Sequence, residues 1–348
     1  MMKKDQLHFL FYVLLTVLAI ALIALIMLPT YETPAPPTED IVSRKTTNFT
    51  RAQASAILPI PQEEPLSSKA QLGEKLFYDP RLSGDGTVSC ATCHDLARAG
   101  ADGRKLGVGV GGALGAYNTP TTFNSVFNFR QFWDGRAADL VEQITGPLTN
   151  VAEMASSWAI AVHRVSEDSD YKEAFKREYG GEISEKTIAN AIMLFESSLL
   201  SPNSPFDRFL NGDADAISSE AKEGYRHFVD YGCISCHQGI NIGGNFFQRF
   251  GVMGNYFSDR GNTTPADLGR YNITKQEKDR YIFKVPSLRN VAVTAPYFHD
   301  GSVDSLDQVI EIMARYQLGR ELPEKERRHL VAFLESLTGE YRGERLKP

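Results

Sequence analysis

The sequence lacks an excess of positive charge. Its 348 residues contain 37 lysines and arginines against 43 aspartates and glutamates, so the formal net charge is −6. A nucleic-acid-binding surface needs the opposite balance, and we therefore expect no nucleic-acid partner. Apolar residues make up 42% and charged residues 23% of the chain, which is typical of a globular protein and excludes a disordered one.

Regular alternation of apolar and polar residues is also scarce. No stretch alternates over more than a few residues, so the pattern does not predict a large sheet. Helical periodicity is more frequent, and Ser218 has the side chain of a helix N-cap. The segments with helical periodicity are 68–77, 187–200, 218–229, 305–316 and 323–337. We therefore predict a mainly α-helical fold with long loops.

The first thirty residues contain a long apolar run. Residues 9–28 carry no charge and follow a pair of lysines. Twenty helical residues rise about 30 Å, the thickness of a bilayer core. A cleaved signal peptide has a shorter apolar core and ends in small residues, whereas this run ends at Leu28-Pro29. We therefore predict an uncleaved N-terminal transmembrane helix within residues 1–30, with a signal peptide as the alternative. By the positive-inside rule, the rest of the chain is exported in either case.

The remainder of the chain divides into a tether and two globular domains. Residues 31–65 are rich in proline, threonine and glutamate and have little apolar periodicity, which predicts an extended tether. We place the two domains at 66–205 and 206–342, because this part of the sequence contains an internal duplication.

The duplication consists of three motifs that recur in the same order. The first copy contains Cys90-Ala91-Thr92-Cys93-His94, then Pro120-Thr121-Thr122-Phe123-Asn124, then Phe132-Trp133-Asp134-Gly135; the second contains Cys233-Ile234-Ser235-Cys236-His237, then Pro286-Ser287-Leu288-Arg289-Asn290, then Phe298-His299-Asp300-Gly301. The asparagine and the aspartate are ten positions apart in both copies. Each copy continues into a helix-like stretch with a methionine, Met154 or Met313. Chance does not explain this repetition.

All four cysteines lie in the two C-x-x-C-H pentapeptides. Two thiols at this spacing can form thioether bonds with the two vinyl groups of a haem, and the adjacent histidine reaches the iron from one face. A disulfide would not explain the histidine in both motifs, and a zinc site would require two distant motifs to meet. The sequence therefore predicts two covalently bound haem c groups, on Cys90 and Cys93 and on Cys233 and Cys236, with His94 and His237 as the proximal iron ligands.

The second axial position of each iron decides the function. Met313 follows His237 on a predicted helix, and a thioether opposite histidine suits electron transfer, although core packing is the alternative for such a methionine. The N-terminal haem has no comparable candidate. The loop 103–115 contains six glycines and no histidine, methionine, cysteine or tyrosine, and Tyr117 follows it. One closed haem and one open haem would suit an enzyme that passes electrons to a bound oxidant.

Taken together, the motifs resemble those of the bacterial di-haem cytochrome c peroxidases. The similarity covers about residues 68–340 and is carried by Asp79-Pro80-Arg81-Leu82-Ser83, Asn118-Thr119-Pro120-Thr121, Phe132-Trp133-Asp134-Gly135-Arg136-Ala137, Glu153-Met154, Leu288-Arg289-Asn290-Val291 and Thr294-Ala295-Pro296-Tyr297-Phe298-His299. The resemblance implies two related cytochrome c-like haem domains on the periplasmic face of the inner membrane. It implies hydrogen peroxide as substrate and a small cytochrome c, a cupredoxin or the membrane quinol system as electron donor, and it leaves room for a homodimer.

The resemblance also implies roles for individual residues. The C-terminal haem, with Met313, would accept electrons, the N-terminal haem would react with peroxide, and Trp133 would lie between the two. Glu153 would move a proton between the peroxide oxygens, and Gln143 would hold the ligand by hydrogen bonds. His299 stands at the repeat position of Trp133 and is a weaker candidate for the same region. A calcium ion is implied between the domains, with the oxygen ligands Asn118, Thr294 and Pro296.

One position departs from the family pattern. Many members carry a histidine in the glycine loop that caps the peroxidatic iron of the oxidised enzyme, and that place falls here at Val110. Related di-haem enzymes that modify a protein use a tyrosine where Met313 stands. A di-haem oxidase acting on a protein or organic substrate is therefore an alternative function, as is a di-haem electron carrier with both irons closed.

Overall fold

The computed structural model describes residues 56–348. The predicted transmembrane helix and most of the predicted tether lie outside these residues. Among the residues described, no helix has both the length and the apolar character needed to cross a bilayer.

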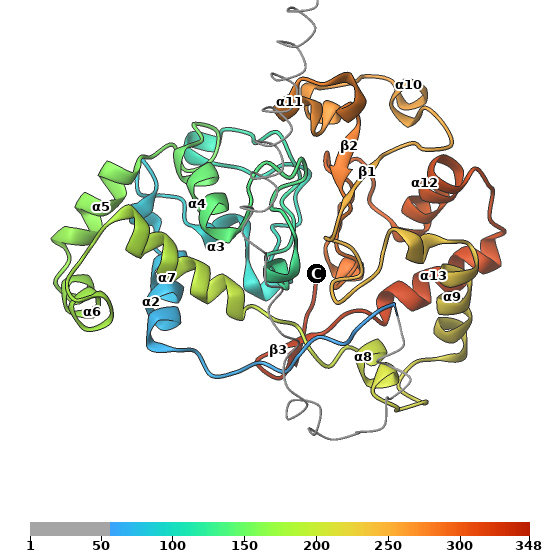
Figure 1. Cartoon of the computed structure of the whole chain (residues 1–348), viewed down its shortest axis with the longest axis horizontal. Coiled ribbons are helices and arrows are strands. Elements are labelled where there is room, and N and C mark those ends of the chain that lie inside the picture. Colours follow the sequence, from blue (N-terminus) through green and yellow to red (C-terminus); the bar gives the residue numbers. More distant parts are fainter. Residues whose placement is uncertain (1–55) are drawn as a thin grey trace, which may run out of the picture. The chain divides into compact units, whose positions relative to one another are not determined.

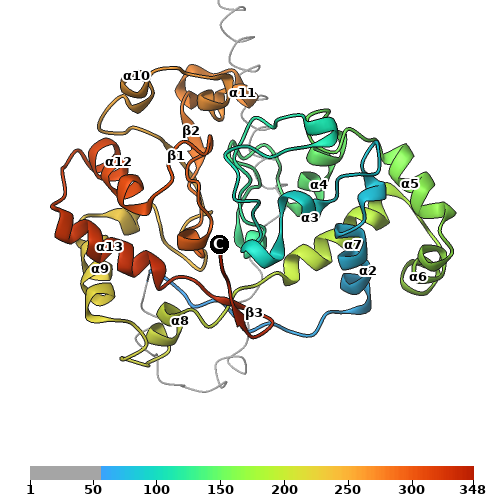
Figure 2. The same ribbon diagram turned by 180° about the vertical axis from the view of Figure 1, so that it is seen from behind.

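The described part of the chain is mainly helical, as the sequence predicts (Figure 1). The first half contains α2 (Ser68–Phe77), α3 (Cys90–Cys93), α4 (Leu140–Thr149), α5 (Trp158–Glu167), α6 (Ser169–Tyr179) and α7 (Glu185–Ser198). The second half contains α8 (Pro205–Leu210), α9 (Ser219–Asp230), β1 (Phe247–Arg249), α10 (Tyr256–Arg260), α11 (Tyr271–Thr274), β2 (Ile282–Lys284), α12 (Leu306–Leu318), α13 (Glu324–Glu335), β3 (Glu340–Tyr341) and β4 (Glu344–Arg345). Strands β1 and β2 pair antiparallel, as do β3 and β4. Figure 2 shows the two halves from behind.

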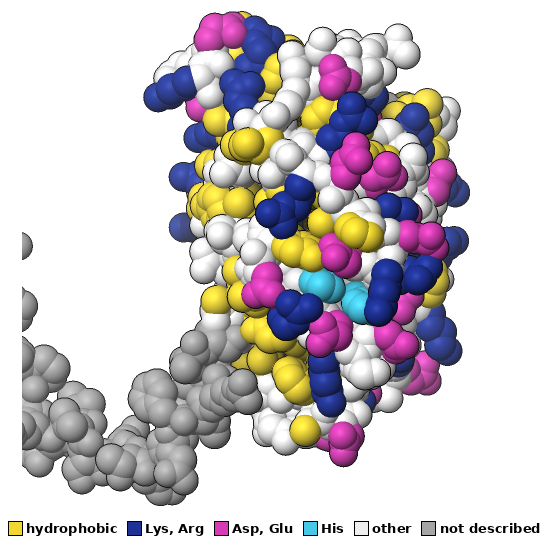
Figure 3. Space-filling view, turned by 90° about the vertical axis from the view of Figure 1, so that its right-hand side faces the viewer, with side chains coloured by type: hydrophobic (Ala, Val, Ile, Leu, Met, Phe, Trp, Pro, Cys, Tyr) yellow, Lys and Arg dark blue, Asp and Glu magenta, His cyan; other side chains and the backbone are white. Residues whose placement is uncertain are grey.

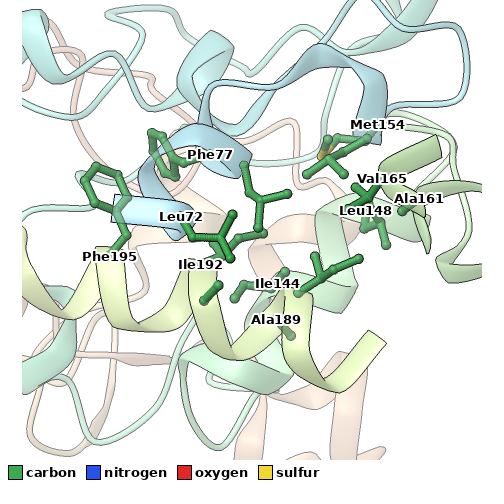
Figure 4. Packing of buried hydrophobic residues seen from close by; sticks show 14 of the residues in the cluster. Leu72, Phe77, Ile144, Leu148, Met154, Ala161, Val165, Ala189, Ile192 and Phe195 are labelled. Carbon is green, nitrogen blue, oxygen red and sulfur yellow. The ribbon is translucent and has the colours of Figure 1, made fainter. Parts of the chain in front are cut away.

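The core of the first half forms where α2 packs against α7. Leu72 and Phe77 face Ile192 and Phe195 in Figure 4, and the rings of Phe77 and Phe195 meet edge to face with their centroids 5.2 Å apart. The two helices approach closely because α2 carries Gly73 at the crossing, where a Cβ would overlap a backbone carbonyl of α7. This packing holds the segments on either side of α3 in place.

The second half repeats the same helix crossing. Helix α9 packs against α13, and a Cβ at Gly224 would overlap the carbonyl oxygen of His329, just as one at Gly73 would overlap that of Ala191. A glycine at each crossing lets two backbones meet that any side chain would hold apart. The duplication predicted from the motifs therefore extends to the helices that flank them.

The repeat is in register at single residues. Asn124 and Asn290 lie 166 positions apart and both have a φ of 61°, in the left-handed region. Phe132 and Phe298 are separated by the same interval and have φ values of 67° and 68°. Helices α4 and α12 also begin 166 positions apart, each capped by a side chain that accepts a backbone N–H. An interval of 166 positions therefore identifies equivalent residues of the two halves from Asn118 onward.

Each end of the described chain packs in the half that is farther from it in the sequence. Ile57 falls within the range predicted as a tether, yet it is completely buried in the hydrophobic cluster of the second half. Leu346, near the C-terminus, packs in the cluster of the first half. Arg289 fastens the crossing segment, since its guanidinium donates to the carbonyl oxygen of Leu58 at 2.6 Å and pairs with the buried Asp207. Residues 56–60 are therefore part of the globular fold and not of a free tether.

Candidate functional site

The two C-x-x-C-H motifs form matching turns. In each, the backbone N–H of the histidine donates to the carbonyl oxygen of the first cysteine at 2.9 Å. This bond closes one helical turn, which places the first cysteine and the histidine on the same side of the turn. All four cysteines are free thiols and partly buried.

The rings of His94 and His237 are both oriented by a backbone carbonyl. Nδ1 of His94 lies 3.3 Å from the oxygen of Gly100, and Nδ1 of His237 lies 3.3 Å from that of Ile242. A carbonyl oxygen only accepts, so we assign the proton to Nδ1, which leaves the Nε2 lone pair free. Burial lowers the pKa of both imidazoles, that of His237 to about 4. Neutral rings with a free nitrogen, each beside two free thiols, fit covalently bound haem.

The two halves differ at the position of the predicted sixth ligand. Met313 lies on α12, partly buried against the aromatic cluster that contains Phe250 and Tyr256. Its equivalent on α4 is Pro147, which has no atom that can ligate iron. Met154 is not the counterpart of Met313, because it lies beyond the end of α4 and its side chain is buried in the first hydrophobic cluster (Figure 4). The iron coordination of Met313 itself stays a prediction.

Glu153 lies in the turn that follows α4. The amide nitrogen of Asn150 donates to its Oε1 at 2.7 Å. Burial raises the pKa of the Glu153 carboxyl above its ordinary value, while the bond from Asn150 and the nearby charge of Arg136 oppose that rise. Gln143 lies one helical turn before Pro147 on α4, so these two residues share a face of that helix. A carboxyl with a raised pKa is suited to take up and release protons.

The glycine loop is an ordered hairpin that lies against the turn of Glu153. Val108 and Leu114 form an antiparallel bridge, and the N–H of Val110 donates to the carbonyl oxygen of Glu153 at 2.8 Å. A Cβ at Gly109 would overlap the backbone of Glu153. The loop therefore needs glycine because its backbone approaches another backbone closely.

Trp133 lies at the seam between the two halves, where hydrogen bonds cross in both directions. Its indole Nε1 donates to the carbonyl oxygen of Asn118 at 2.9 Å. The N–H of Asn118 donates to the oxygen of His299 at 2.8 Å, and the N–H of Lys284 donates to the oxygen of Trp133 at 2.9 Å. The last two bonds are equivalent under the repeat, because Lys284 and His299 follow Asn118 and Trp133 by 166 positions. The seam is thus held by a reciprocal pair of bonds.

His299 belongs to a buried ionic network that the sequence did not reveal. Its Nε2 lies 2.7 Å from Oδ1 of Asp267, and both side chains are buried. Arg260 pairs with Asp267 and Asp300 at 2.6 Å each. Hydrogen bonds from His299 and Arg260 hold the pKa of Asp267 well below its usual range, although burial acts in the opposite direction. The contact with His299 has no local signal, since the two residues are 32 positions apart.

The segments that carry the predicted calcium ligands meet at the same seam. Asn118 is buried, its amide nitrogen donates to the carbonyl oxygen of Arg104 at 2.8 Å, and its backbone is bonded to His299. That bond brings Asn118 close in space to the chain segment with Thr294 and Pro296. The coordination of an ion by these residues stays a prediction.

Comparison with known proteins gives consistent results. A family model described as di-haem cytochrome c peroxidase matches residues 67–215. The chain is 49% identical to the cytochrome c peroxidase Ccp of Escherichia coli over 82% of its own length and 61% of that protein's length. It is 42% identical to the cytochrome c551 peroxidase of Pseudomonas aeruginosa, over 82% of the chain and 86% of the relative. It is 35% identical to the methylamine utilization protein MauG of Methylorubrum extorquens, over 81% of this chain and 82% of that protein.

Solved structures show the same fold. A MauG-like protein associated with microbial copper homeostasis superposes with a TM-score of 0.73 at 32% identity, over 81% of this chain and 94% of that one. The diheme peroxidase BthA of Burkholderia thailandensis superposes with a TM-score of 0.65 at 19% identity, over 82% of this chain and 92% of that one. The second likeness concerns the fold alone.

Proposed function

The chain belongs to the di-haem cytochrome c peroxidase family, and we propose that it reduces hydrogen peroxide to water with electrons from a small periplasmic redox protein. The observation that carries this proposal is the difference between equivalent residues Met313 and Pro147. The C-terminal half has a thioether where the N-terminal half has no ligating atom, so Met313 would hold one haem iron for electron transfer, and the equivalent Pro147 would leave the other iron free for a substrate. The higher identity to the peroxidases than to MauG supports the same choice.

The residues around the N-terminal half supply proton chemistry. Haem c, when bound, supplies an iron that exchanges single electrons. Reduction of one hydrogen peroxide to two waters consumes two electrons and two protons. The Glu153 carboxylate accepts a proton from one peroxide oxygen and returns it to the other as the bond between them breaks, and Gln143 holds the peroxide by hydrogen bonds. The hairpin of the glycine loop, which is bonded to the backbone of Glu153, keeps that carboxyl in position.

Electrons enter through the C-terminal half and leave it at the seam. Trp133 contacts both halves there, packing against the aromatic cluster of the C-terminal half while its indole is bonded to Asn118. An aromatic ring fixed at that place is suited to relay an electron between the haems. The face in Figure 3 mixes basic and acidic side chains without a field of one sign. This face therefore gives no preference by charge between a cytochrome c and a cupredoxin as donor.

The proposal includes a structural calcium ion, membrane attachment and room for a homodimer. Asn118 uses its amide nitrogen on Arg104, which leaves its oxygen for a hard cation together with oxygens of Thr294 and Pro296. The apolar residues 9–28 would anchor the protein, as an uncleaved helix, at the periplasmic face of the inner membrane. These features do not affect the chemistry assigned to Glu153.

The mass of the purified protein tests the cofactor. After expression with the periplasmic maturation machinery, it should exceed that of the polypeptide by two haems, and Cys233→Ala should weaken or remove one attachment because one thioether bond is lost. The same preparation should consume peroxide with reduced cytochrome c. A mass without added haem, or two haems without any peroxide turnover, would overturn the proposal, the second result in favour of an electron carrier.

The variant Met313→His tests the electron-entry haem. Imidazole favours ferric iron relative to a thioether, so the haem should stay low-spin while its midpoint potential falls by a sizeable part of the ~0.8 V span that axial ligands cover. Turnover should fall because electrons no longer enter at a useful potential. Spectroelectrochemical titration measures this shift, and Met193→Leu, on α7 of the other half, is a control that keeps Met313. An unchanged potential would show that Met313 serves only to pack the core.

A further inference from the structure

Lys284 is a buried cation without a counter-charge in the described part of the chain. It ends β2, and the residue is 9% exposed. No described residue forms an ion pair or a hydrogen bond with its ammonium group, and burial lowers the pKa of that group to about 8. Burying an ammonium ion is strongly unfavourable unless an anion accompanies it. An anion bound here would stabilise the charged form of Lys284, and no described side chain provides one.

The side chain lies on the side of β2 that faces the N-terminal half. Lys284 is directly opposite Phe247 in the pairing of β1 with β2, so the two side chains share one face of the hairpin. The ring of Phe247 stacks edge to face on Phe129 and occupies the space beside Gly135, both of which belong to the N-terminal half. Phe283, the preceding residue, points the other way and packs against His299. The ammonium group is thus held near the seam.

The same strand leads directly to the proximal histidine of the C-terminal haem. Pro286, two residues after Lys284, has its backbone carbonyl within hydrogen-bonding range of the His237 ring. A haem held by His237 carries two propionate carboxylates on the edge opposite its thioether bonds. We propose that the ammonium group of Lys284 binds a propionate of this haem. The propionate supplies the missing anion, and the bond is charge-assisted on both sides.

The contact would make the midpoint potentials of the two haems differ, because the repeat places different side chains beside them. This consequence for electron flow rests on the proposed function. The equivalent of Lys284 in the N-terminal half is Asn118, which is neutral. A fixed positive charge stabilises the reduced form of a nearby haem and so raises its midpoint potential. The electron-entry haem therefore has a charged side chain at a position where the equivalent side chain of the other half is neutral. Lys284 and Met313 act in the same direction on the C-terminal haem.

The test is a redox titration of the two-haem protein without peroxide. In Lys284→Met, which keeps an unbranched side chain one atom shorter and removes the charge, the midpoint potential of the C-terminal haem should shift downward while that of the other haem stays unchanged. Lys284→Arg keeps the charge and should remain near the wild type. Lys278→Met removes an exposed lysine of the same segment and should leave both potentials unchanged. An unchanged potential in Lys284→Met with both haems bound would overturn the inference.

A second measurement tests the contact in case Lys284→Met does not fold. Resonance Raman spectra report the propionate bending modes of haem, which respond to the strength of the hydrogen bond at the carboxylate. The mode should shift between the wild type and Lys284→Arg, since a guanidinium replaces an ammonium donor, and an absent shift would overturn the contact. Neither readout uses peroxide. If the protein proved not to be a peroxidase, the redox and Raman results would still show whether Lys284 binds the propionate. If Lys284 proved not to bind it, the proposed peroxidase function would still stand.

Discussion

Replacing Glu153 with glutamine is expected to lower peroxide turnover by about 10²–10⁴-fold while both haem spectra stay as in the wild type. Glutamine keeps the size of the side chain and can still accept the hydrogen bond from Asn150, which is 2.7 Å long in the structure. It cannot accept and return a proton. The loss should therefore appear in kcat with peroxide in excess, and it should be measured with reduced cytochrome c as donor.

The pH dependence of the wild type supplies a second signature of Glu153. Its pKa is raised by burial, and the carboxylate is the form that accepts a proton from peroxide. Activity should therefore fall as the pH drops through this raised pKa, and the acid limb should be absent from the residual activity of Glu153→Gln. Glu167→Gln, at the exposed end of α5, is the matched control and should behave as the wild type. Equal turnover in Glu153→Gln and the control would remove Glu153 from the mechanism.

The fully oxidised protein is expected to react with peroxide without prior reduction. The equivalent of Met313 is Pro147, the loop 103–115 has no histidine, methionine, cysteine or tyrosine, and Tyr117 is engaged beside Arg136 and Asn272. No side chain in these places has to leave the iron before peroxide binds. The ferric spectrum should contain a high-spin component that disappears with one equivalent of peroxide. A ferric protein that is entirely six-coordinate and low-spin would contradict this prediction.

Val110→His tests the same idea from the other side. A histidine here could bind the iron of the N-terminal haem, so the oxidised protein should become low-spin. It should then lose most of its activity with peroxide unless it is reduced first. Val110 is partly buried against the first core cluster, so some repacking accompanies the change. Leu114→His, at an exposed position of the same hairpin, controls for the added imidazole and should stay high-spin and active.

Several features of the site depend on contacts that sequence patterns do not record. The motifs predicted the duplication, but they paired Met313 with Met154, because two methionines in helix-like stretches look alike along the chain. The structure pairs Met313 with Pro147, since α4 and α12 begin at equivalent positions and α4 ends before Met154. The burial of Lys284 was equally hidden. A lysine is usually exposed, whereas Lys284 is buried in the folded chain.

The sequence alone predicted the haem attachment, the proximal histidines and the mainly helical class, and the structure confirms the helical class. Covalent attachment is a property of five consecutive residues, and helical periodicity is a property of neighbouring turns, so both can be read from the chain alone. The tertiary structure decided which residues are buried and what accompanies them, including Ile57 in the core and Lys284 at the seam. Burial and charge compensation arise from segments that are distant in the chain, as in the buried ion pair between Arg289 and Asp207, and no local pattern contains such a contact.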